Sequence, residues 1–171
     1  HVDSSAASDV YKRQVEGNAF GGGIGIISVC DIAVSLDNIK LALTEAKLGL
    51  IPATISPYVV LKVGSSNAID MFTSARTFSP QEGQKIGLIK LFTTSHKIDD
   101  TITNEILPFL KNAPAALSAS KKLVRNLSAK IDENTIRFTV EALADVWENP
   151  EAIEGINAFF VKRKPNWLME K

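Results

Sequence analysis

The pattern of apolar and polar positions changes its period at about residue 99 of this chain. Before that point, short apolar runs alternate with glycine, proline and asparagine, whereas after it apolar residues recur every three or four positions. Short apolar or alternating runs predict strands, and a spacing of three and four predicts amphipathic helices. The pattern therefore predicts an α/β layer followed by a helical region.

The first part of the chain divides into short elements. Strands are predicted at 15–16 (the end of one), 31–36, 39–43 and 88–92. Helices are predicted at 20–30 (after an opening loop), 52–63, 66–74 and 79–86. We expect Gly64 to end the second of these helices, and Pro57 to cost it one internal hydrogen bond if this proline lies beyond the first turn. The helix from Ser79 has the clearest start, because Ser79, Pro80 and Glu82 match a capping box with proline at the first helical position.

The second part of the chain predicts four amphipathic helices, the last beginning at Asn149-Pro150-Glu151. Apolar residues at helical spacing give each helix one stripe that we expect to be buried. Such a region either covers the core or forms a subunit interface. The residues of the first three stripes are Ile102, Ile106, Leu107, Leu110, Ala116, Leu117, Leu123, Val124, Leu127, Ile136, Val140, Leu143 and Trp147.

Residues 1–14, HVDSSAASDVYKRQ, do not resemble the rest of the chain. They lack an initial methionine and a hydrophobic core of the signal-peptide kind, so we interpret them as a leader or junction outside the fold. The predicted organisation is a leader at 1–14, a partial α/β core at 15–98 and a helical assembly region at 99–171. Val15 then begins within a strand, so we expect this chain to be the C-terminal part of a larger protein.

Composition limits the class of protein without identifying it. The chain has 171 residues, 45% of them apolar, which suffices for one domain with its own core. It has no apolar run of about 18 residues or more. Lysine and arginine together number 19, as do aspartate and glutamate, so no net charge attracts nucleic acid or an anionic membrane. We therefore expect a soluble protein with neither a nucleic-acid nor a membrane partner.

The single cysteine, Cys30, lies in the apolar run IISVCDIAV and cannot form a disulfide within the chain. This placement favours a buried thiol in a reducing compartment, and we expect a cytoplasmic protein. A reactive thiol is the alternative interpretation.

Several common catalytic patterns are absent or incomplete. Gly23 and Gly25 begin a dinucleotide-binding pattern, but its third glycine position falls on Ser28 and no full strand precedes it. No Gly-Lys-Ser/Thr follows the glycines, which argues against a Walker phosphate loop. The two histidines, His1 and His96, lie in polar segments, so the sequence supports neither a metal site nor a histidine-dependent nucleophile.

Most of the remaining chemistry lies between Val15 and Pro52. Gly21, Gly22 and Gly23 precede an apolar helical stretch, so their backbone N–H groups suit the binding of developing negative charge. Glu45 is a carboxylate between apolar segments, where it can act as a general acid or base. The alternatives are that the glycines only permit close helix packing and that Glu45 is a solvated surface charge.

The same stretch resembles a known family. The segment VEGNAFGGGIGIISVCDIAVSLDNIKLALTEAKLGLIPATISPYVV is similar to the second half of the active-site region of the enoyl-CoA hydratase/isomerase family, also called the crotonase superfamily. The later stretches ARTFSPQEGQKIGLI and EGINAFFVKRKPNW resemble the same family, so the resemblance covers Val15 to Trp167. The wording LTEAKLGLIPATISPYVV is most similar to the methylglutaconyl-CoA hydratase and carboxygeranoyl-CoA hydratase branch, associated with leucine and acyclic terpene breakdown.

The resemblance implies a crotonase-like ββα spiral core, here without its N-terminal part, and a C-terminal helical region. It also implies assembly into a homotrimer or a dimer of trimers, and an acyl-CoA thioester as substrate. No cofactor is implied beyond the coenzyme A of the substrate. Two backbone N–H groups of the family bind the thioester oxygen, and one of them matches Gly22, with Gly21 and Gly23 beside it in the substrate-binding turn. The other comes from a loop upstream of this chain.

Hydratases of the family commonly use two glutamates, and only one has a match here. The second matches Glu45, whereas the first falls on Gly25, which has no carboxylate. A lone carboxylate can shuttle a proton, as the double-bond isomerases of the family do, while hydration needs a group that orients water. Glu45 together with the Ala53 N–H is a candidate for that role. We favour an enoyl-CoA hydratase, with an isomerase and a catalytically incomplete assembly fragment as alternatives.

The C-terminal tail resembles a second site. Its aromatic residues and Lys162 match the family segment in which a lysine approaches the nucleotide end of coenzyme A, often from a neighbouring subunit. The alternative is a basic last helical turn that suits the helix dipole, with Phe159 and Phe160 in the core.

Overall fold

Strands and helices are interspersed up to residue 93, and helices alone follow, in a computed structural model that describes residues 11–169. The strands are β1 (Lys12–Val15), β2 (Ala19–Phe20), β3 (Ile32–Leu36), β4 (Leu41–Ala42) and β5 (Leu91–Thr93). The α-helices are α2 (Gly22–Val29), α3 (Ser56–Ser74), α4 (Pro80–Lys85), α5 (Ile98–Leu110), α6 (Pro114–Leu127), α7 (Glu133–Trp147) and α8 (Pro150–Phe160). Short 3-10 helices are η1 (Glu45–Leu48), η2 (Ser95–Lys97) and η3 (Asn166–Leu168).

All the strand pairs are parallel. One sheet has the order β1-β3-β5, with Lys12 opposite Ile32 and Val34 opposite Leu91. The second sheet is the pair β2-β4, in which Ala19 lies opposite Leu41. Parallel pairing places the carboxyl ends of neighbouring strands at one edge, so the segments that follow β2 and β4 lie together.

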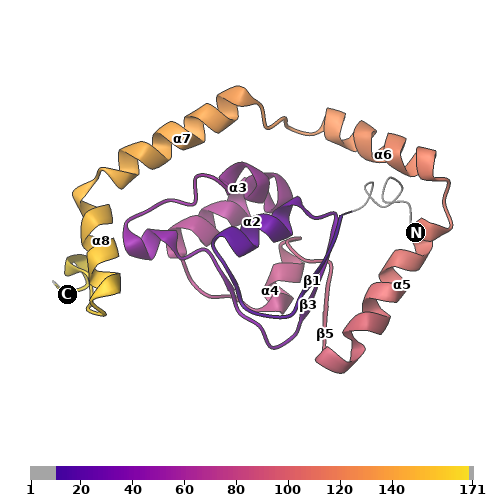
Figure 1. Cartoon of the computed structure of the whole chain (residues 1–171), viewed down its shortest axis with the longest axis horizontal. Helices are drawn as coiled ribbons and strands as arrows, with labels where there is room; N and C mark the ends of the chain where they lie inside the picture. The colour runs from indigo at the N-terminus through magenta and orange to yellow at the C-terminus, as the bar shows by residue number, and fades with distance from the viewer. Residues whose placement is uncertain (1–10, 170–171) are drawn as a thin grey trace.

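Figure 1 shows the sheets packed against α2 and α3, with α5 to α8 forming an arc around this core. All five residues of β3 are buried, as expected for a parallel strand covered on both faces. The arrangement confirms the predicted α/β layer followed by a helical region. Fully or almost fully buried residues of the core include Ile24, Ala33, Val34, Leu41, Leu43, Val59 and Leu88.

The first strand begins earlier than the sequence predicts. Lys12, Arg13 and Gln14 fall within the predicted leader, but they pair with β3 as part of β1. Their side chains are exposed on an edge strand, so their polar composition did not reveal the strand. The remaining part of the predicted leader, 1–10, lies outside the described residues. The predicted strands 39–43 and 88–92 are also shifted or shortened, to β4 and β5.

The two helices predicted at 52–63 and 66–74 lie within the range of α3, as two helical halves that meet at a kink. Gly64 was expected to end the first of them, and this is confirmed. Its φ of 79° and ψ of 159° are not helical and are accessible essentially to glycine alone, so the regular helix is interrupted there. Pro57 lies in the first turn of α3 and therefore removes no internal hydrogen bond. Pro52 precedes the helix rather than beginning it.

The capping box at the start of α4 is confirmed. The Glu82 N–H donates to the Ser79 hydroxyl at 3.2 Å, and the Ser79 N–H donates to the Glu82 carboxylate at 3.0 Å. Arg76 forms ion pairs with Glu82 and Asp70 across the preceding turn. These contacts lower the pKa of the Glu82 carboxyl, chiefly through the Ser79 N–H and then through Arg76.

The helical arm, defined as α5 to α8, leaves most of its apolar stripe exposed. The prediction that each stripe is buried is therefore wrong for α6 and α7, because the arc runs around the core instead of lying on it (Figure 1). Within 11–169, no helix is long and apolar enough to cross a membrane. Exposed apolar residues of α6 and α7 are Leu123, Val124, Leu127, Ile136, Phe138, Val140 and Trp147.

Candidate active site

The parallel pair β2-β4 brings the glycine turn and Glu45 together. Gly21 directly follows β2, and its N–H donates to the Ala42 carbonyl of β4 at 3.1 Å. Glu45 lies three residues beyond Ala42 and is the first residue of η1. The segments that follow β2 and β4 therefore leave the same sheet edge side by side.

Gly21 lies directly against the carboxylate of Glu45. A Cβ atom added at Gly21 would be 3.1 Å from Glu45 Oε1, so no bulkier residue fits there without displacing the carboxylate. The residue also has φ 50°, a conformation that glycine adopts at little cost. Both features explain why the turn requires glycine at this position.

Gly22 and Gly23 begin helix α2 and can donate N–H groups to a ligand. Backbone N–H groups in the first turn of a helix have no partner within that helix. The N–H of Gly21 is used by Ala42, which leaves the next two as the available donors of the turn. A hollow of about 300 Å³ is lined in part by Ala19, Phe20 and Gly23, but Gly22 and Glu45 are not among its lining residues.

The Glu45 carboxylate has one buried oxygen without a partner. Glu45 Oε2 is buried and accepts no hydrogen bond from any residue within 11–169. Buried polar atoms are nearly always hydrogen-bonded, so an unpaired carboxylate oxygen points to a water molecule or a ligand atom as its partner. The alternative that Glu45 is merely a solvated surface charge does not fit this buried atom.

Gly25 lies under the side chain of Ile55, in the turn before α3. A Cβ atom at Gly25 would be 2.4 Å from Ile55 Cγ2 and 2.9 Å from Ile55 Cβ. Ile55 therefore fills the space that any side chain at position 25 would need. The first glutamate of the family pair is absent at position 25, and Ile55 occupies the space that its side chain would need.

Ala53 and Lys162 lie in different surroundings. Ala53 is buried in the turn that precedes α3, close in sequence to Ile55. Lys162 is exposed just beyond α8, with φ 54°. The described contacts do not join Lys162 to Glu45, so the structure does not bring every predicted site residue into one place.

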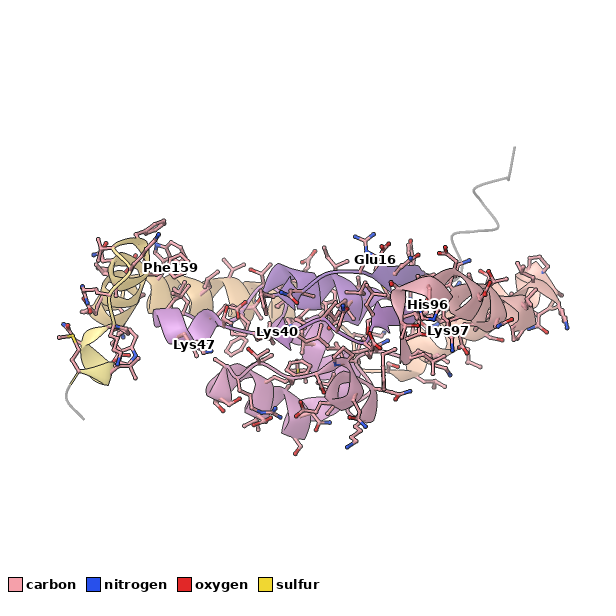
Figure 2. All side chains as sticks on the ribbon, turned by 90° about the horizontal axis from the view of Figure 1, so that it is seen from below. Glu16, Lys40, Lys47, His96, Lys97 and Phe159 are labelled. Atoms are coloured by element: carbon pink, nitrogen blue, oxygen red, sulfur yellow. The ribbon has the colours of Figure 1, made fainter. Side chains whose placement is uncertain are left out.

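The aromatic residues before Lys162 are not part of the core. Phe159 and Phe160 are 64% and 75% exposed, and their rings meet edge to face at 5.8 Å. The alternative that they are core residues is therefore wrong. Figure 2 shows Phe159 on α8 at the same end of the molecule as Lys47 of η1.

Cys30 is buried, as the sequence favours. Its thiol donates to the Ile26 carbonyl at 3.2 Å, and burial raises the pKa of the thiol. A raised pKa leaves less thiolate, which argues against a reactive cysteine. The Lys62 ammonium donates to the Cys30 carbonyl at 2.8 Å, and burial lowers the pKa of Lys62.

In the described part of the chain, no three histidine, cysteine or acidic side chains form a group able to hold a metal ion.

Sequence reasoning missed three residues that shape this site. They are Ile55, which covers Gly25, and the pair Gly49 and Gly155, through which η1 contacts α8. Ile55 carries no sequence signal, because its role depends on how closely α2 and the turn before α3 approach. The two glycines lie inside LGLIP and EGINAFF, but neither stretch reveals that they meet.

This arrangement of sheets, glycine turn and helices is the crotonase-like fold. An enoyl-CoA hydratase structure from Mycobacterium avium superimposes with a TM-score of 0.82 at 31% identity, covering 91% of this chain and 61% of that one. The sequence matches the family described as Enoyl-CoA hydratase/isomerase over residues 13–170. The chain therefore belongs to the enoyl-CoA hydratase/isomerase family.

The curated relatives of this chain carry the names of more than one enzyme. An enoyl-CoA hydratase from Alternaria alternata is 36% identical over 112 residues, which is 65% of this chain and 38% of that protein. A carnitinyl-CoA dehydratase from Shigella flexneri is 28% identical over 158 residues, which is 90% of this chain. The chain spans 60% of the length of that dehydratase.

Proposed function

We propose that this protein is an enoyl-CoA hydratase, a lyase that adds water across the 2,3-double bond of an acyl-CoA thioester. The observation that carries the proposal is the buried, unpaired Oε2 of Glu45 beside the turn of Gly21 and Gly22. Family membership and the hydratase and dehydratase names of relatives support the same reaction class.

In the proposed mechanism, Gly22 stabilises charge and Glu45 transfers protons. Water attacks the β-carbon of the enoyl group while Glu45 accepts a proton from it, and electron density moves to the thioester oxygen. The Gly22 N–H donates to that oxygen, and removing one such donor typically costs about 100 to 1,000 fold in rate. The enolate then collapses as its α-carbon takes the proton, which completes the addition. The Ala53 N–H is our candidate for holding the water together with Glu45.

Glu45→Gln in the full-length protein tests this assignment. Glutamine keeps the size of the side chain but cannot accept and return a proton, and general acid–base catalysis contributes typically about 100 to 10,000 fold. We expect the rate of hydration of a short 2-enoyl-CoA to fall by at least about 100 fold. The rate is measured from the loss of absorbance of the conjugated double bond. Lys47→Gln, an exposed substitution on the same 3-10 helix, is the control. Hydration retained in Glu45→Gln would refute the role of Glu45.

Double-bond isomerisation by Glu45 alone is the second candidate function. It is favoured by the Gly25 and Ile55 contact, which leaves no room for a second carboxylate. Incubation with a 3-enoyl-CoA separates the two: an isomerase yields the conjugated 2-enoyl thioester and stops there, whereas a hydratase acting on the 2-enoyl thioester yields the 3-hydroxy thioester. An accumulating 2-enoyl product that takes up no water would favour the isomerase.

The proposed function also includes the acyl group of the substrate and the oligomeric state of the enzyme. The resemblance of LTEAKLGLIPATISPYVV makes a methylglutaconyl-like acyl group the first substrate to test. We also propose a homotrimer or dimer of trimers, in which the exposed Phe159, Phe160 and Lys162 meet the nucleotide end of coenzyme A.

A catalytically incomplete fragment that acts only in assembly is the remaining alternative. It is supported by the second oxyanion donor of the family, which matches no residue of this chain. Turnover of a 2-enoyl-CoA by residues 11–171 alone would exclude it.

A further inference from the structure

Glu45 is held on an element that is too short to be rigid by itself. η1 has four residues and ends at Gly49, which has φ 69° and ψ 21°. Its local hydrogen bonds include Gly49 N–H to Ala46 at 3.2 Å and Leu50 N–H to Glu45 at 3.0 Å. Short 3-10 turns have poor hydrogen-bond geometry, so the position of Glu45 depends on what η1 packs against.

η1 packs against helix α8, from the far end of the chain. Figure 1 shows the purple turn at residues 45–48 next to α8, and Figure 2 shows Lys47 of η1 at the same end as α8. The contact is backbone to backbone. A Cβ atom at Gly155 would be 2.4 Å from the Leu48 carbonyl oxygen, and one at Gly49 would be 2.6 Å from the Glu151 carbonyl oxygen.

The face of α8 that meets η1 is small and buried. Ala152 and Ala158 are 0% and 1% exposed on the same helix face as Gly155, at a spacing of three. The opposite side carries exposed residues such as Ile153. Small side chains on one face let two backbones approach closely, so this face fits η1 specifically.

Local side-chain contacts stabilise α8 and the segment that follows it. The Asn149 side chain caps the first turn by accepting from the Glu151 N–H at 2.9 Å. In the middle of the helix, Glu154 accepts two hydrogen bonds from Arg163 and one from the Asn166 N–H at 2.9 Å. These contacts stabilise the helix against which η1 packs.

We propose that Gly49 and Gly155 are positioning residues, through which α8 holds η1 and thereby places the Glu45 carboxylate against Gly21. The inference rests on the proposed function of Glu45. Neither glycine touches the reacting atoms. A displacement of η1 by a fraction of an ångström moves the carboxylate relative to the oxyanion turn, and misplacement of about 1 Å can cost about 100 fold in rate.

The test measures Gly155→Ala in the full-length protein, alone and combined with Glu45→Gln. We expect Gly155→Ala to lower kcat for a short 2-enoyl-CoA by about 10 to 100 fold, with KM changed by about twofold at most. In the Glu45→Gln background the same substitution should have little further effect, because the group it displaces is already inactive. Asn157→Ala, an exposed change on α8, is the matched control and should leave kcat unchanged.

The outcomes separate this inference from the proposed function. Full activity in Glu45→Gln would refute the role of Glu45 itself. A large loss in Glu45→Gln, with an equal further loss from Gly155→Ala in both backgrounds, would refute positioning and leave the role of Glu45 standing. If Gly155→Ala does not fold, Glu154→Gln is the second variant. It weakens the ion pair of Glu154 with Arg163 and adds no atoms to the contact between η1 and α8. It should lower kcat only where Glu45 is present, and equal losses in both backgrounds would overturn the inference.

Discussion

A Cβ atom at position 25 would lie 2.4 Å from Ile55 Cγ2, so Gly25 and Ile55 form one packing unit. We predict that Gly25→Ala destabilises the protein by about 1–3 kcal/mol, the usual cost of overpacking a buried position. In an Ile55→Ala background the same change should cost less, because most of the obstructing atoms are gone. Urea unfolding of the two single variants and the double variant measures this coupling. Equal costs in both backgrounds would contradict it.

The sequence predicts a site residue when that residue belongs to a recognisable motif. It does not predict a residue whose role depends on the packing of two elements. The triple glycine and Glu45 stand out in the sequence as candidate chemistry, and the structure places Gly21 against Glu45. Ile55 does not stand out, since it is one apolar residue among many. Its effect on position 25 follows from the approach of two backbones, which no local pattern encodes.

At the scale of the element, the start of α4 couples stability to pH. The Ser79 N–H and Arg76 lower the pKa of the Glu82 carboxyl in the folded protein. A carboxyl whose pKa is lowered by folding contributes stability above its unfolded pKa, about 4.3, and this contribution is lost as the pH falls through the lowered value. The start of α4 should therefore weaken in acid.

Glu82→Gln tests this dependence. We predict a lower melting temperature than the parent at pH 7, with the difference shrinking below about pH 4. Because the pair with Arg76 is exposed, its part of the effect should not exceed about 1 kcal/mol. Thermal unfolding at both pH values measures the effect, and Glu141→Gln on exposed α7 is the control. A difference that stays constant with pH would disagree with the assignment.

Elements were predicted best where a local signal marks their ends. Ser79 and Asn149 begin helices where the sequence places them, because a cap is a local hydrogen bond. Gly64 interrupts α3 where the sequence predicts the end of a helix, because its φ of 79° and ψ of 159° are not helical. Strand ends were missed, since pairing with β3 keeps polar Lys12 to Gln14 in the sheet.

At the scale of the whole molecule, the exposed stripe of α6 and α7 predicts self-association. We predict that Phe138→Glu, at a residue 70% exposed on α7, lowers the molar mass of the full-length protein in light scattering after size exclusion. A charge in an apolar interface is costly, so the assembly should dissociate toward monomers.

Ile69→Glu is the matched control for this variant. Ile69 is an apolar residue of α3, 64% exposed but outside the helical arm, and its replacement should leave the mass unchanged. An unchanged mass in Phe138→Glu would show that this stripe is not the interface.

The class of fold was predictable, but the placement of its helices was not. A change of period near residue 99 separates the α/β layer from the helical region in the sequence, and in the structure only helices follow β5. An amphipathic stripe shows that a helix face is apolar, not what covers it. The arm therefore curves around the core although its sequence resembles that of buried helices (Figure 1).

The contact between η1 and α8 also has a consequence for the order of folding. Gly21 and Glu45 are 24 residues apart, so β2 and β4 can pair early, whereas Leu48 and Gly155 are 107 residues apart. Contacts between distant residues require closure of a longer loop and tend to form later. During refolding, the sheets would be native before α8 docks. Recovery of activity should then lag behind recovery of secondary structure, and on a ribosome it would wait until α8 has been synthesised.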